Sequence, residues 1–209
     1  MEENQVQQDL ASIRSLMERS SKFISLSGLS GILAGIYALI GSGAAYCILY
    51  NTGSVSSPSR YNALSIYNSV ELVQLMGLSL VVLVASIATG VLLSVKKARK
   101  NRVSIWGPSS RALLFNMMVP LLTGGILILI LLLRGYLGII APTTLIFYGL
   151  SLIGASNNTF YDVKYLGFSE IILGLIAALF PGWGLLFWAI GFGVLHIVYG
   201  SIMYIKYDR

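Results

Sequence analysis

The sequence predicts an all-α membrane protein with six transmembrane helices arranged as three antiparallel hairpins. Of the 209 residues, 56% are hydrophobic and only 11% are charged, whereas a soluble domain carries about 25% charged residues. Uncharged runs long enough to cross a bilayer, which takes about 20 residues, recur along the chain. The Lys and Arg residues flank these runs, so we expect the lipid bilayer, and not nucleic acid, to be the main partner.

Polar segments and turn-forming residues divide the chain. Residues 1–22 carry apolar side chains at helical spacing, which predicts a cytoplasmic amphipathic lead-in helix rather than a cleaved signal peptide. Residues 23–205 form the predicted transmembrane domain, and residues 206–209 form a cytoplasmic tail. The expected spans cover residues 23–50, 72–95, 112–133, 137–155, 165–180 and 185–205.

The last two spans are separated because one helix over residues 165–205 would be too long. Forty-one helical residues would reach roughly 60 Å, about twice the hydrocarbon thickness. Pro181 and Gly182 lie inside this run and supply a turn, since proline removes a helix hydrogen bond.

The distribution of basic residues predicts the orientation. With six spans and both chain ends in the cytoplasm, twelve of the 14 Lys and Arg residues lie inside, and Arg60 and Arg134 lie outside. This asymmetry follows the positive-inside rule. Short loops suit a bacterial inner membrane, where we expect a multi-pass protein.

Small residues in the first span predict close helix packing. Gly28, Gly31 and Gly35 lie three or four residues apart, and such residues let helix backbones approach each other in lipid. We expect this packing to lie within one subunit. A homodimer, or a contact with another membrane protein, is the alternative.

Two ionisable residues lie deep in the last hairpin. Glu170 is 13 residues before Trp183, and His196 is 13 residues after it, so an antiparallel hairpin brings both to one depth. We predict that they touch, with Tyr199 one turn along from His196. The contact is either a structural hydrogen bond or a proton or pH site. A metal site is disfavoured because no second acid or histidine is near.

Two further polar groups lie near the predicted membrane surfaces. Glu71, Gln74 and Arg134 would meet at the outer surface, either as solvated helix ends or as the mouth of a cavity with a Glu71–Arg134 pair. On the inner side, a basic run predicts a topology determinant that also contacts anionic lipid. This run consists of Lys96, Lys97, Arg99, Lys100 and Arg102.

The last hairpin also carries a family resemblance. Its sequence reads LGFSEIILGLIAALFPGWGLLFWAIGFGVLHIVYGSIMYIK, an apolar half-helix, a proline turn and then Gly191, Gly193 and Gly200. This pattern resembles the repeated hairpin of the HdeD-like acid-resistance membrane proteins, over about 40 residues. The chain otherwise resembles uncharacterised bacterial integral membrane proteins. The resemblance implies a six-helix fold and supplies no catalytic residue.

The sequence favours a non-enzymatic role. No nucleophile lies beside a base at a fixed spacing, and no metal or cofactor motif is present. We therefore expect a stress-related, scaffolding or accessory membrane component without a cofactor. A small proton-coupled transporter or channel that uses Glu170 and His196 is the alternative.

Overall fold

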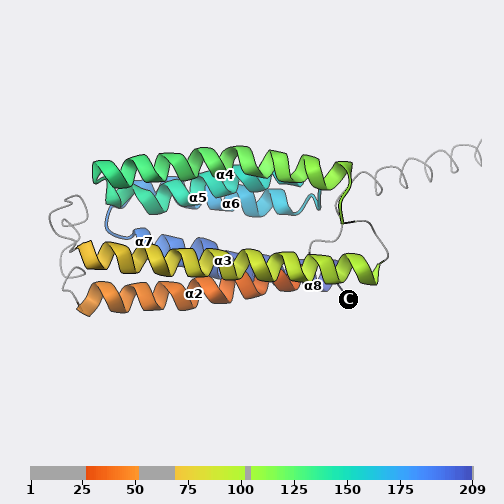
Figure 1. The fold of residues 1–209 in the computed structure, drawn as a ribbon, viewed down its shortest axis with the longest axis horizontal. Coiled ribbons are helices and arrows are strands. Elements are labelled where there is room, and N and C mark those ends of the chain that lie inside the picture. Colours follow the sequence, from red (N-terminus) through yellow and green to blue (C-terminus); the bar gives the residue numbers. More distant parts are fainter. Residues whose placement is uncertain (1–26, 52–68, 102–104, 209) are drawn as a thin grey trace, which may run out of the picture.

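The protein is all-helical across the residues that the computed structural model describes, which are 27–51, 69–101 and 105–208 (Figure 1). The predicted lead-in helix at residues 1–22 and Arg102 lie outside these ranges. In chain order the elements are α2 (Gly28–Asn51), α3 (Ser69–Lys100), α4 (Pro108–Arg134), the 3-10 helix η3 (Leu137–Ile139), α5 (Ile140–Ser156), α6 (Val163–Leu179), α7 (Gly184–Trp188), the π-helix η4 (Ala189–Leu195) and α8 (His196–Tyr207).

The helices fit a multi-pass membrane protein by length and hydropathy. Five segments of the described chain are long and apolar enough to cross a membrane, namely Gly28–Leu49, Val70–Lys100, Pro108–Arg134, Leu137–Ser156 and Gly184–Tyr207. The sixth long helix, α6, has 17 residues and so reaches about 26 Å. Large apolar side chains are exposed along α3 and α4, as expected of helices that face lipid.

Short signals set the ends of several helices. Helix α4 begins at Pro108, since proline is tolerated in the first turn, and ends at Arg134, where Gly135, with a left-handed φ of 80°, caps it. Gly182, with a φ of 100°, makes the turn after Pro181. Helix α3 continues through the basic run to Lys100, because Lys, Arg and Ala favour helix and positive charge suits a helix C-terminus.

The helices pack as two groups of three. Helix α5 lies between α4 and α6, and α2 lies between α3 and α8, with η4 also on α2. The elements α7 and η4 join the groups, because α7 contacts α5 and η4 contacts both α2 and α6. The third predicted hairpin is therefore splayed: α6 packs mainly on α5, whereas α8 packs mainly on α2. Glycines allow both close contacts, because Gly149 of α5 lies against Gly167 of α6, and Gly31 of α2 lies against Gly200 of α8.

The predicted glycine stripe on α2 lies against η4 and α8 of the same chain. A Cβ on Gly31 would lie 3.2 Å from the Cα of Gly200, and a Cβ on Gly35 would lie 2.7 Å from the carbonyl oxygen of Gly193. Gly28 likewise faces the backbone of Tyr204. The stripe thus packs within the subunit.

Replacing Gly35 with valine should therefore destabilise the fold. The valine Cβ would meet the Gly193 carbonyl at 2.7 Å, and overpacking of this kind costs about 1–3 kcal/mol. Gly43→Val is the matched control, because it lies on the same helix and nothing lies within 4 Å of its Cβ position. Thermal unfolding of the detergent-solubilised variants measures the difference, and equal losses at both positions would contradict this packing.

Candidate functional site

A buried carboxyl group without a hydrogen-bond partner marks the centre of the candidate site. The side chain of Glu170, on α6, is 0% exposed, and neither of its oxygens has a partner. Its Oε1 lies 3.5 Å from Nδ1 of His196, so the predicted contact between the two residues is present. A Cβ on Gly191 would lie 2.6 Å from Oε2. Glycine at this position makes room for the carboxyl group.

Both nitrogens of the His196 ring have a hydrogen-bond partner. Nδ1 lies 3.0 Å from the carbonyl oxygen of Gly191; because a carbonyl only accepts, Nδ1 is the donor. Nε2 lies 2.8 Å from the hydroxyl of Tyr148, which donates to it when the ring is neutral. The carbonyl and the ring are five residues apart, within and just after the π-helical turn η4. Such turns occur frequently at functional sites.

An aromatic cluster surrounds the histidine. The ring of Phe192 lies 5.8 Å from that of His196, 5.0 Å from Tyr148 and 5.0 Å from Trp188, between centroids. These rings place the Glu170–His196 pair in apolar surroundings, where a charge is costly. The carboxyl group therefore needs a proton, a cation or a donor from a neighbour, and His196 is the nearest basic group that the structure shows.

Sequence reasoning placed Tyr199 correctly on the helix but missed Tyr148. Tyr199 packs against Leu152, Val163 and Leu166, and its hydroxyl is buried without a hydrogen-bond partner. It does not bond to His196, whose second nitrogen takes Tyr148 instead. Tyr148 comes from α5, a helix outside the hairpin. In the sequence, the one feature that could have indicated Tyr148 was its polar hydroxyl within an uncharged, apolar segment.

The predicted polar group at the outer mouth is not assembled. No ion pair joins Glu71 to Arg134 among the described residues. Glu71 is buried at the start of α3, whereas Gln74 and Arg134 are exposed. The pair was predicted from the proximity of the helix ends alone.

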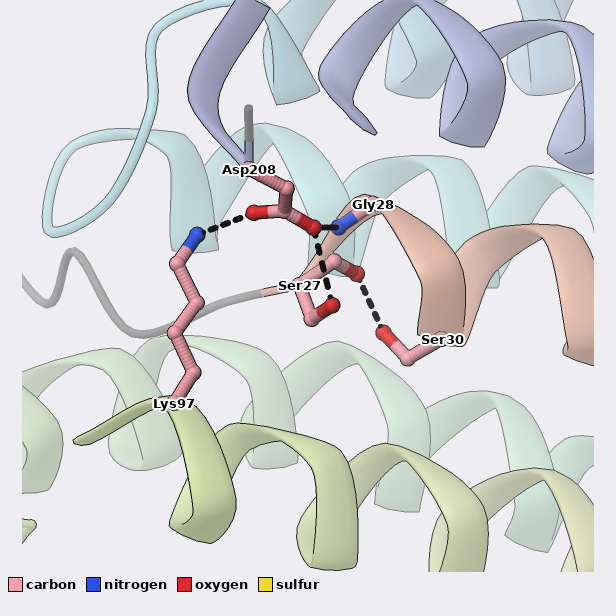
Figure 2. Close-up of polar contacts among 5 residues, drawn as sticks. All are labelled: Ser27, Gly28, Ser30, Lys97 and Asp208. Atoms are coloured by element: carbon pink, nitrogen blue, oxygen red, sulfur yellow. Dashed lines mark hydrogen bonds and ion pairs between the residues drawn. The ribbon is translucent and has the colours of Figure 1, made fainter. Parts of the chain in front are cut away.

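The opposite end of the bundle is held by Asp208, which joins three helices (Figure 2). Its Oδ1 pairs with Nζ of Lys97 on α3. Its Oδ2 accepts hydrogen bonds from the hydroxyl of Ser27, at 2.9 Å, and from the N–H of Gly28, at 2.8 Å. A carboxylate here satisfies an unpaired N–H at the start of α2 and suits the positive end of that helix. Lys97 is thus a structural residue as well as a member of the predicted lipid contact.

The other members of the basic run that the structure describes are exposed. Lys96, Arg99 and Lys100 all lie on the surface of the last turns of α3. Their exposure leaves them free for the predicted contact with anionic lipid head groups.

A second carboxylate lies at the same end. Oδ2 of Asp162, just before α6, accepts hydrogen bonds from Nζ of Lys206, at 2.6 Å, and from the hydroxyl of Tyr207, at 2.7 Å. Partial burial alone would raise the pKa of Asp162, but these hydrogen bonds and the Lys206 charge hold it below its usual value. The contact joins α8 to the start of α6.

The Asp208 carboxylate is shifted in the same direction. Burial would raise its pKa, but hydrogen bonds from Lys97 and Ser27, the Lys97 charge and the Gly28 N–H together lower it. A lowered pKa means that the folded state favours the ionised form. The resulting stability is present above the unfolded pKa, about 3.9, and is lost as the pH falls through the folded value.

Comparisons with known proteins add no relative: no family model, no curated protein and no solved structure matches this chain. The resemblance of the last hairpin to HdeD-like proteins therefore stays a prediction. Among the described residues, no group of three or more His, Cys, Asp or Glu side chains could hold a metal ion. The Glu170 cluster is the candidate site that the structure offers.

Replacing Asp208 with asparagine should cost about 1–3 kcal/mol of stability at neutral pH, because charge-assisted hydrogen bonds are lost. The cost should shrink as the pH falls through the lowered pKa of the wild-type carboxyl, because that group is then protonated as well. Lys97→Gln should show the same loss, and Lys100→Gln, an exposed position on the same helix, should not. Thermal unfolding across pH tests this, and a pH-independent cost would contradict the ionic contribution.

Proposed function

We propose that this protein is a non-enzymatic integral membrane protein whose helix packing responds to a proton at Glu170 and His196. It would act as an accessory or stress-related component of a bacterial inner membrane. The observation that carries the proposal is the Glu170 carboxyl group, which is 0% exposed, has no hydrogen-bond donor and lies 3.5 Å from the imidazole.

The proposed orientation has six spans and both chain ends in the cytoplasm. The twelve-to-two distribution of basic residues supports it. The Asp208 contacts support it as well, because they bring residues 27 and 208 and the end of α3 to one end of the bundle. Reporter fusions at the two chain ends read this orientation, and opposite locations for the two ends would exclude it.

A proton at this site would change helix contacts for a physical reason. Glu170 belongs to α6, His196 to α8 and Tyr148 to α5, so the site joins the two helix groups. A charged carboxylate and a charged imidazole attract strongly in apolar surroundings, whereas a lone charge there is costly. A change of one proton therefore alters how tightly α6 and α8 are held together.

A small proton-coupled transporter or channel is the second candidate. The π-helical turn η4 interrupts the last apolar segment beside the buried carboxyl group. Interrupted helices next to mid-membrane polar groups are typical of transporters. Proton flux into liposomes that contain the purified protein, compared with the Glu170→Gln variant, distinguishes this role from a response without transport.

Trp188 offers a direct readout of the proposed proton site. Its ring lies 5.0 Å from the ring of Phe192, tilted by 41°, and the Phe192 ring in turn stacks on His196. In a Trp106→Phe, Trp183→Phe background, Trp188 is the one remaining tryptophan of three. We expect its emission in lipid nanodiscs to titrate with pH, and we expect Glu170→Gln to abolish the transition or shift it by at least about one pH unit.

The matched control is Glu71→Gln, which alters a buried acid at the start of α3. It should leave the Trp188 titration unchanged. The proposal fails if Trp188 shows no pH response, or if Glu170→Gln and Glu71→Gln titrate alike.

A further inference from the structure

Three residues hold all the buried side-chain oxygens that lack a hydrogen-bond partner in the described chain. The atoms are both carboxyl oxygens of Glu170, Oγ of Ser151 and the hydroxyl of Tyr199. Buried polar groups are nearly always hydrogen-bonded, to protein or to water. Other buried hydroxyls have partners in their own helix, as Thr143 bonds to the carbonyl of Ile139.

The two unpartnered hydroxyls lie on one side of Glu170. Gly149 and Gly167 face each other where the antiparallel α5 and α6 cross. Ser151 is therefore on the side of this crossing that leads to Asp162, and Glu170 lies on the other side. On α8, Tyr199 is one turn beyond His196 toward Tyr207. Both hydroxyls thus lie between Glu170 and the end of the bundle that holds Asp162 and Asp208.

One face of α8 links this end to the site. His196, Tyr199, Met203 and Tyr207 follow each other at spacings of three or four residues, and so share a face. Tyr207 contacts Asp162, and Tyr199 packs on the α5–α6 cluster. From His196 to Tyr207 the helix rises about 16 Å, which is roughly half of a bilayer core.

The other half of the bundle has no comparable groups. Between Glu170 and the turn at Pro181, the buried residues of α6 are Gly174 and Ala177. The facing part of α5 contributes Leu145, which is 0% exposed, and Thr143, whose buried hydroxyl donates a hydrogen bond to the carbonyl of Ile139. Among the described residues, no buried side-chain oxygen on this side lacks a hydrogen-bond partner.

We propose that Glu170 exchanges its proton with one end of the bundle, the end that holds Asp162 and Asp208, through Tyr199 and Ser151. The titratable groups around the route are Tyr148 on α5, His196, Tyr199 and Tyr207 on α8, and Asp162 with its partner Lys206 at the end of the bundle, since α7 and η4 carry none. Met203, which is 2% exposed, fills the α8 face between Tyr199 and Tyr207 and closes the route. Its unbranched side chain can move aside. This route rests on the proposed proton site, and it specifies from which end of the bundle the proton reaches that site.

Cysteine accessibility tests the route. In a Cys47→Ser background, which removes the exposed native thiol, Ser151→Cys and Tyr199→Cys are treated in proteoliposomes with a charged, membrane-impermeant methanethiosulfonate. Lys96→Cys and Trp183→Cys, both exposed, define the two faces, so the assignment does not depend on orientation in the cell. Ala177→Cys, 1% exposed, is the buried control on the apolar side.

We expect Ser151→Cys and Tyr199→Cys to react from the Lys96 face only and Ala177→Cys to react from neither. Adding Met203→Ala should accelerate the reaction about tenfold, equivalent to about 1.4 kcal/mol in an opening equilibrium. Reaction from the Trp183 face, or from neither face at both positions, would overturn the route. The labelling experiment is independent of the Trp188 titration. If Trp188 shows no pH response but the cysteines still react from the Lys96 face only, the proposed function is contradicted and the route is not.

Discussion

The buried carboxyl group of Glu170 is the constraint on which the rest of the structure depends. It lies against the backbone of Gly191 and 3.5 Å from His196, at the place where the two helix groups meet. A larger residue at 191 would displace it, and a regular α-helix would not bring the Gly191 carbonyl to the His196 ring in the same way. The π-helical turn therefore sets the geometry of the site, and helix interruptions of this kind occur frequently at functional sites.

The other features of the fold hold this arrangement in place. Glycines on α2 and η4 bring α8 close to α2, and Gly149 and Gly167 bring α6 close to α5. At one end, Asp208 ties α8 to α2 and α3, and Asp162 ties it to the start of α6. In lipid, close backbone packing and polar contacts replace the hydrophobic effect as the source of helix association. The site thus lies between two helix groups that are each firmly packed.

Much of this could be predicted from the sequence, and the exceptions have physical reasons. The length of the uncharged segments predicted the helical membrane class. The equal spacing of Glu170 and His196 from Trp183 predicted their contact. Tyr148 could not be predicted because it lies on α5, outside the hairpin, and it meets His196 across 48 residues of sequence. The splayed third hairpin was missed because α8 packs on α2, through contacts such as that of Gly31 with Gly200, which lie far apart in the chain. The Glu71–Arg134 pair was predicted from proximity of helix ends, but the direction of a side chain is set by tertiary packing.

A double-mutant cycle between Glu170 and His196 tests the central claim most directly. The unfolding free energies of the wild type, Glu170→Gln, His196→Gln and the double variant are compared in one lipid or detergent system. Residues that interact directly show coupling of about 0.5–3 kcal/mol. We expect a coupling free energy in this range between Glu170 and His196. Additive losses, with no coupling beyond error, would show that the two side chains do not act as a pair and would contradict the account.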